Sequence, residues 1–213
     1  MLANHSRKPS LPYLLPIGLL FAIFIGLGIS TIQQQPWIMQ LNLTVDAVLQ
    51  RYQTAFLTYF MQCVSFLGDK KYLLPAVFLS GLVFYYWGYR RMTYLWWFNA
   101  ALTSTIVYST KHIWYSARPM LDNLSSSFPS GHVSLFSAVF LLASYLRSQR
   151  SIHPTRIYGF TLILILLMML SRMYLNFHWL SDVLGGLALG TSCFLLSTYL
   201  LACQQDVFRK HTS

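Results

Sequence analysis

Six stretches of this chain carry at most one charged residue each, and this pattern more than any other restricts its fold. The stretches span residues 11–31, 72–88, 93–110, 132–146, 157–175 and 180–203. Charged residues make up only 9% of the chain, whereas about a quarter of a soluble globular domain is charged. A helix needs about 20 mainly apolar residues to cross a bilayer, and the shorter stretches approach this length when end residues such as Lys111 and Arg172 lie at the interface. We therefore expect an all-α, polytopic membrane protein built as a six-transmembrane-helix bundle.

Residues 36–68 differ from these stretches. Asp46 and Arg51 interrupt the segment 36–68, and polar residues are scattered over 52–68. A helix of this composition lies along a membrane surface more readily than it crosses the bilayer. We therefore expect an additional interfacial helical segment between the first and second spans, with a seventh span as the alternative.

The basic residues between the stretches predict the orientation in the membrane. With six spans, nine basic residues fall on the side that holds both termini: Arg7, Lys8, Arg90, Arg91, Arg147, Arg150, Arg156, Arg209 and Lys210. The other side holds six: Arg51, Lys70, Lys71, Lys111, Arg118 and Arg172. Because cytoplasmic loops are enriched in Lys and Arg, both termini are expected in the cytoplasm. A seventh span would separate Arg7 and Lys8 from the other basic loops, which counts against it. The net charge of +10 is thereby attributed to topology, and we expect no nucleic-acid partner.

The N-terminal end resembles a signal peptide, because Arg7 and Lys8 precede an apolar run. However, the uncharged stretch continues to Val45, and no clear small-residue cleavage site precedes Gln33. We expect a retained membrane anchor. Since neither repeats nor low-complexity linkers are found, residues 1–213 are expected to form a single integral-membrane domain.

Three segments fall at the non-cytoplasmic end in this topology, and they span 111–119, 129–132 and 171–182. In the first, Lys111 and Arg118 are seven residues apart, or two helical turns, so both can point the same way before Pro119 discourages the helix. A guanidinium fork matches phosphate oxygens and a lysine adds a mobile charge, so the pair can bind an anion. The alternative is a pair of cations that reach the membrane interface from a helix end.

The second segment, Pro129-Ser130-Gly131-His132, precedes an apolar stretch and is typical of a helix start. We expect Ser130 at the N-cap, while Gly131 allows backbone amides to approach a ligand. Free N–H groups at a helix N-terminus attract phosphate, and His132 in the first turn is disfavoured in its protonated form unless a bound anion compensates. An ordinary capped helix with an interfacial histidine is the alternative.

The third segment places His178 and Asp182 four residues apart, hence on one face of a helix. A carboxylate that accepts the proton of one imidazole nitrogen fixes the tautomer and makes the other nitrogen more basic. The same face continues to Gly186 and Gly190, which let a neighbouring helix approach closely, so we expect this face to look into the bundle. A structural His/Asp pair is the alternative.

The three segments together supply three cations, two histidines, one aspartate and a helix N-terminus. Displacement at phosphorus needs these groups: positive charge for the phosphoryl oxygens, a nucleophile with its orienting acid, and a proton donor for the leaving group. Asp182 is the only carboxylate within the three segments, which makes a poor two-metal site, so we expect no metal and no other cofactor.

These residues resemble the type 2 phosphatidic acid phosphatase superfamily, which includes bacterial lipid phosphate phosphatases and the soluble vanadium haloperoxidases. The superfamily pattern is Lys-x6-Arg-Pro, then Pro-Ser-Gly-His, then Ser-Arg-x5-His-x3-Asp. All three blocks occur here in order and without substitution, and this motif region, 111–182, covers about a third of the chain.

The resemblance implies a metal-independent lipid phosphatase, a phosphoric ester or diphosphate hydrolase that acts through a phosphohistidine at the outer membrane face. His178 would be the nucleophile, Asp182 its orienting acid and His132 the proton donor to the leaving oxygen. The residues implied to bind the substrate phosphate are Lys111, Arg118, Ser130, Gly131 and Arg172. The expected substrate is a membrane lipid phosphate, such as undecaprenyl pyrophosphate, phosphatidylglycerol phosphate, phosphatidate or a lipid A phosphate, in the bacterial cytoplasmic (inner) membrane.

Other functions stay open at this level. The same site would serve a phosphotransferase that passes the phosphoryl group to a second lipid, because water and a lipid acceptor attack the same intermediate. A non-enzymatic anion or lipid transporter would carry charges through the depth of the bilayer, whereas here they gather at one end. A vanadate-dependent haloperoxidase is disfavoured because those relatives are soluble. Nothing in the sequence predicts the oligomeric state.

Overall fold

The computed structural model describes residues 11–119 and 126–210, with side chains described over 14–119 and 126–203. These residues form eight α-helices and no strand: α1 (Leu11–Ile32), α2 (Pro36–Arg51), α3 (Ala55–Leu67), α4 (Lys70–Tyr86), α5 (Arg90–Ile113), α6 (Gly131–Ser148), α7 (Pro154–Tyr174) and α8 (Leu180–Lys210). The prediction of an all-α fold is confirmed, and the six apolar stretches correspond to α1 and to α4 through α8. The basic side chains predicted near both termini, Arg7, Lys8, Arg209 and Lys210, lie outside the described ones.

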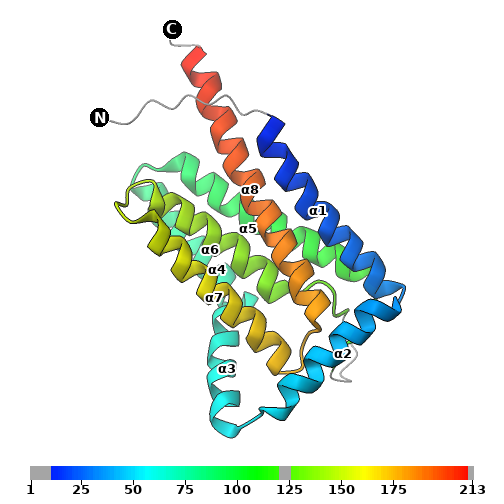
Figure 1. Ribbon diagram of the computed structural model, residues 1–213. Helices are drawn as coiled ribbons and strands as arrows, with labels where there is room; N and C mark the ends of the chain where they lie inside the picture. Colours follow the sequence, from blue (N-terminus) through cyan, green and yellow to red (C-terminus); the bar gives the residue numbers. More distant parts are fainter. Residues whose placement is uncertain (1–10, 120–125, 211–213) are drawn as a thin grey trace.

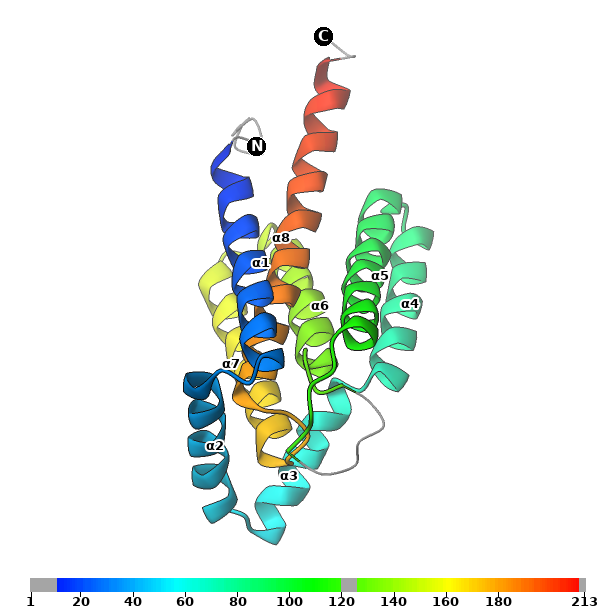
Figure 2. The same ribbon diagram turned by 90° about the vertical axis from the view of Figure 1, so that its right-hand side faces the viewer.

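Helices α1 and α4 through α8 form the bundle, whereas α2 and α3 lie at one end of it (Figure 1). Figure 2 shows the start of α1 and the end of α8 together at the opposite end. Among the described residues, three helical segments are long and apolar enough to cross a membrane by length and composition: Leu14–Ile32, Pro154–Tyr174 and Leu180–Cys203. The chain is therefore a polytopic helical membrane protein, and the count of six spans stays a prediction.

Helix α8 lies between α1 and α6 and packs extensively against both. Two of its glycines set the distance to α6. A β-carbon on Gly186 would lie 2.8 Å from the carbonyl oxygen of Ser130. A β-carbon on Gly190 would lie 2.4 Å from the carbonyl oxygen of Ser134, which is closer than real β-carbons approach. The prediction of a small-residue face turned into the bundle is confirmed.

The segment after α1 forms two helices, each with one face docked on the bundle. Helix α2 packs against α7 and α8, and α3 packs against α7. Their inner faces are buried at Asn42 and Ser65, while Phe56 and Tyr59 are exposed on the outside. Exposed aromatic side chains at one end of a membrane bundle are consistent with the predicted interfacial location. The buried inner faces show that this segment is also a structural part of the bundle end.

Tyr174, the last residue of α7, anchors the turn between α2 and α3. Its buried side chain accepts a hydrogen bond from the backbone N–H of Thr54 at 3.0 Å. Thr54 in turn caps α3, because its hydroxyl accepts from the N–H of Leu57. This anchor joins α3 to the end of α7, where the third sequence block begins.

Candidate active site

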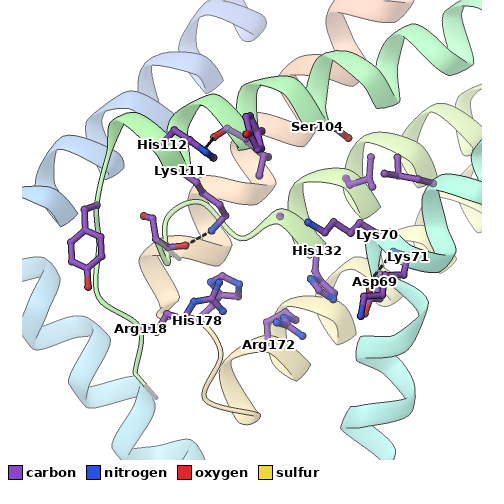
Figure 3. Close-up of a pocket in the computed structure, with 18 residues that line it drawn as sticks. Asp69, Lys70, Lys71, Ser104, Lys111, His112, Arg118, His132, Arg172 and His178 are labelled. Atoms are coloured by element: carbon purple, nitrogen blue, oxygen red, sulfur yellow. Dashed lines mark hydrogen bonds between the residues drawn. The ribbon is translucent and has the colours of Figure 1, made fainter. Parts of the chain in front are cut away.

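A cavity of about 870 Å³ opens at the end of the bundle where α2 and α3 lie (Figure 3). Six of the predicted site residues line it: Lys111, Arg118, Gly131, His132, Arg172 and His178. The other two, Ser130 and Asp182, are fully buried behind its wall. Residues from three separate sequence blocks therefore meet around one space.

His178 and Asp182 are in contact, but not for the reason expected from helical spacing. Helix α8 begins at Leu180, so His178 lies in the loop before it and only Asp182 is in the first turn. Nδ1 of His178 nevertheless lies 3.3 Å from Oδ2 of Asp182. This contact engages Nδ1 and leaves Nε2 as the ring nitrogen available for chemistry.

The Asp182 carboxylate is held by two further donors. The backbone N–H of Trp179 donates to Oδ2 at 2.8 Å, and the hydroxyl of Ser127 donates to the same oxygen. Oδ1 has no hydrogen-bond partner within residues 11–119 and 126–210, and the residue is fully buried. The carboxylate is thus fixed in one orientation toward His178.

Burial lowers the pKa of His178 to about 4 from its ordinary value of 6.5. The hydrogen bond and charge of Asp182 oppose this shift, and the positive charges of Arg172 and Lys111 add to it. The imidazole is consequently neutral near pH 7, which is the state a nucleophile requires.

Ser130 occupies the N-cap position of α6, as predicted. Its backbone is extended, and its side chain makes no capping hydrogen bond. Among the described residues, none is a hydrogen-bond partner of the buried hydroxyl. The backbone N–H of Ser130 donates instead to the carbonyl oxygen of Asp182 at 3.0 Å, which ties the start of α6 to the start of α8.

Lys111 and Arg118 line the same cavity, although the predicted two-turn helix between them does not form. Helix α5 ends at Ile113, and residues 114–118 are non-helical. The ammonium group of Lys111 donates to the carbonyl oxygens of Ser126 at 2.5 Å and Ser127 at 3.0 Å. An ammonium group has three protons, so these two bonds leave one for a ligand.

Arg172, in the last turn of α7, is 6% exposed and is held from two sides. Its Nη1 donates to the hydroxyl of Ser65 on α3 at 2.5 Å, and its guanidinium carbon lies 4.4 Å from the ring centroid of Phe177. Its backbone oxygen accepts from the N–H of His178 at 3.2 Å. In the part of the chain that the structure describes, the buried Nε has no partner and remains as a donor.

Sequence reasoning missed several residues at this site. Ser127 lies just before the second block, but a lone serine in a serine-rich loop gives no signal. Ser65 and Gly68, at the end of α3, are brought to the site by the packing of α3 on α7 and α4. Lys70 and Lys71 were counted only as loop charges, yet both line the cavity. Among the residues described, no group of three or more His, Cys, Asp or Glu side chains is placed to hold a metal ion.

Known proteins match the chain across this region. Residues 107–205 match the family model described as the PAP2 superfamily. Phosphatidylglycerophosphatase B of Bacillus subtilis is 28% identical over 144 residues, which cover 64% of this chain and 71% of that protein.

Two crystal structures share the fold. A transmembrane PAP2 type phosphatidylglycerolphosphate phosphatase from Bacillus subtilis matches with a TM-score of 0.78 at 23% identity, covering 86% of this chain and 94% of the other. Aquifex aeolicus LpxE matches with a TM-score of 0.59 at 22% identity, covering 74% of this chain and 94% of the other. At these identities the two structures establish likeness of fold.

Proposed function

We propose that the chain is a member of the PAP2 superfamily, whose family model matches residues 107–205, and that it is a membrane lipid phosphatase acting on a lipid phosphate monoester or pyrophosphate. The observation that carries the proposal is the convergence of Lys111, Arg172, His132 and His178 on one cavity. A buried carboxylate behind His178 adds the orienting group that a nucleophilic histidine needs.

In the first step, Nε2 of His178 attacks phosphorus. An N–P bond forms while the bond from phosphorus to the lipid oxygen breaks, and His132 gives its proton to that oxygen. Asp182 stabilises the positive charge that the attack places on the imidazole. In the second step, water attacks phosphorus, the N–P bond breaks, and His132 takes up the proton of the water.

Positive charge and hydrogen-bond donors are proposed to hold the phosphoryl oxygens. Lys111, Arg118 and Arg172 supply the charge, and Arg172 has an unused Nε donor. The unpartnered hydroxyl of Ser130 and the backbone at Gly131 supply neutral donors at the start of α6. Donors already fixed before substrate arrives need no reorganisation during the reaction.

The substrate is proposed to be phosphatidylglycerol phosphate in the first instance, because a relative at 28% identity is a phosphatidylglycerophosphatase. Undecaprenyl pyrophosphate, phosphatidate and a lipid A phosphate are the other candidates. The proposed location is the bacterial inner membrane, with both termini in the cytoplasm and the cavity facing the periplasm or exterior. The loop charges support this orientation.

Phosphate release from these four lipid classes by purified protein tests the proposal. Wild-type protein should release phosphate from at least one class, and His178→Ala should lower the rate about 10⁴-fold, because it removes the nucleophile. His112→Ala is the matched control. His112 also lines the cavity, but its ring packs against Tyr108 in a tilted arrangement and lies outside the catalytic set, so its loss should change the rate less than about threefold.

Release that is equal in wild-type and His178→Ala protein would rule out the proposed mechanism. Labelled phosphate that appears on a second lipid instead of in solution would assign the site to phosphoryl transfer.

A further inference from the structure

The cavity is larger than one phosphoryl group requires. Its volume of about 870 Å³ lies at the upper end of the range, about 300–1,000 Å³, of pockets that enclose whole small ligands. Part of its lining comes from Asp69, Lys70 and Lys71, which belong to none of the three sequence blocks (Figure 3). Substrate atoms beyond the reacting phosphate are therefore expected to reach these residues.

Asp69 fixes the position of the two lysines. It is the N-cap of α4, and its Oδ1 accepts from the backbone N–H of Lys71 at 2.9 Å. Lys70 and Lys71 are thereby the first two residues of the helix. Their backbone is helical, and their exposed side chains line the cavity.

The turn before α4 lies close to the proposed proton donor. A β-carbon on Gly68 would lie 3.4 Å from Cδ2 of His132. Lys70 follows Gly68 by two residues, so their Cα atoms are at most about 7 Å apart. A lysine side chain with four methylene groups easily spans the remaining distance to a group bound beside His132.

Two adjacent lysines at this end of the molecule need an explanation. The positive-inside bias places Lys and Arg on the cytoplasmic side, whereas α4 begins at the opposite, non-cytoplasmic end of the predicted topology. Cations that only reach toward lipid headgroups would lie on the outer surface. Lys70 and Lys71 instead line the same cavity as the phosphate-binding cations.

We propose that Lys70 and Lys71 form a second anion subsite, which binds a second phosphorus-bearing group of the same lipid substrate. The reacting phosphate lies among Lys111, Arg172 and His178, and the second group is a phosphodiester or the inner phosphate of a pyrophosphate. This inference rests on the proposed function, and it selects lipids with two phosphorus groups over phosphatidate. It assigns the choice of substrate to α4, outside the sequence blocks that carry the chemistry.

Binding to protein that carries His178→Ala provides the primary test, because it does not depend on turnover. Binding of phosphatidylglycerol phosphate and of a prenyl pyrophosphate is compared with binding of phosphatidate in neutral detergent, with and without Lys70→Gln plus Lys71→Gln. We expect the double substitution to weaken binding of both two-phosphorus lipids about tenfold and of phosphatidate less than twofold. Lys70→Arg plus Lys71→Arg should restore most of the loss, because the charge is kept.

Arg51→Gln is the matched control, since Arg51 ends α2 on the same predicted side of the membrane and does not line the cavity. In otherwise wild-type protein, the lysine substitutions should raise KM for the two-phosphorus lipids and leave kcat within about twofold. Equal weakening of all three lipids, or no weakening, overturns the subsite. An effect that appears only after anionic phosphatidylglycerol is added assigns the lysines to a neighbouring headgroup and also overturns it.

The two proposals fail in different ways. If the protein hydrolyses none of the lipids but the lysine substitutions still weaken binding tenfold, the phosphatase proposal is rejected and the subsite proposal is supported. If the protein hydrolyses the lipids and the lysine substitutions change neither binding nor KM, the phosphatase proposal is supported and the subsite proposal is rejected.

Discussion

The motif region 111–182 and the segment 36–68 build the same end of the molecule in different ways. The motif region supplies the charged groups and histidines that line the cavity, including Lys111, Arg172 and His178. The helices of the segment supply buried neutral polar side chains that bond to motif residues, such as Asn42 to Ser181 and Ser65 to Arg172. Motif spacings in the sequence therefore identify the residues that carry out the chemistry. Single polar residues in an apolar segment determine the positions of those residues.

Asn42 illustrates the second kind of contribution. It is 2% exposed, its Nδ2 donates to the hydroxyl of Ser181 at 3.0 Å, and its Oδ1 accepts from the N–H of Ser181 at 3.0 Å. Ser181 lies in the first turn of α8, where backbone N–H groups have no partner within the helix. Asn42 therefore caps, from α2, the helix that carries Asp182.

The largest contrast between the two regions is expected from the same substitution made in each. Asp182→Asn should lower kcat about 10³-fold with KM little changed, because the amide cannot stabilise the imidazolium that forms at His178. Asp46→Asn on α2 should leave kcat within about twofold, since Asp46 accepts from Gln50 on its own helix and does not line the cavity. Steady-state phosphate release measures both. If the Asp182→Asn variant keeps more than a tenth of the activity, the proposed difference in role between the motif region and the segment 36–68 is contradicted.

A smaller effect is expected when Asn42, which supports the start of α8, is replaced and the proposed catalytic residues are left unchanged. Asn42→Ala leaves the buried N–H of Ser181 without a partner, which should lower the free energy of unfolding by about 1–3 kcal/mol. The start of α8 is then less well fixed, so kcat should fall about 10- to 100-fold at a temperature where the protein is still folded. Thermal unfolding and kinetics in detergent measure the two effects.

Gln40→Ala, on the exposed side of α2, is the control for Asn42→Ala and should change neither quantity. Loss of stability without loss of kcat in the Asn42 variant would show that α2 supports the fold but not the position of Asp182.

A glycine contact gives a smaller effect again. A β-carbon on Gly68 would lie 2.7 Å from Cε of Met168, which must move, and 3.4 Å from Cδ2 of His132. Because the end of a methionine side chain is flexible, Gly68→Ala should lower kcat only about three- to tenfold. Gly159→Ala on α7 is the control, since a β-carbon there meets no atom within 4 Å. Unchanged kcat in Gly68→Ala would show that the α3–α4 turn does not constrain His132.

Much of the fold follows from patterns along the chain, because lipid requires long apolar helices. The ends of α4, α5 and α6 fall within three residues of the predicted stretches, and the glycine face of α8 was predicted from its spacing. The two helices of the segment 36–68 were less predictable, since one hydropathy pattern fits a surface helix and a docked helix equally well.

The sequence predicted which residues meet at the site more successfully than it predicted their geometry. His178 and Asp182 meet across a loop and a helix start, not along one helix, and Arg118 lies in a non-helical segment. Asn42 and Ser181 are 139 residues apart, and Arg172 and Ser65 are 107 apart. Contacts between residues so distant along the chain depend on how the helices pack, and a single polar side chain carries no local sign of its partner.

The smallest expected effect concerns the titration of His178, which lies in the motif region and is expected to depend on α2. His178 owes its lowered pKa mainly to burial, so its imidazole should stay neutral at pH 5.5 and take up a proton with a midpoint near pH 4. The unfolded chain takes up this proton near pH 6.5, so His178 lowers the free energy of unfolding as the pH falls from about 6.5 to 4 and has no such effect above 6.5. NMR of histidine-labelled protein in micelles, assigned with His178→Ala, follows the titration directly.

If α2 keeps water away from the start of α8, the Asn42→Ala variant should titrate His178 at a higher pH than the wild type, because burial is relaxed. The Gln40→Ala variant should not. A wild-type midpoint near 6.5 would mean that water already reaches His178. The segment 36–68 would then set only the position of the motif residues and not their protonation.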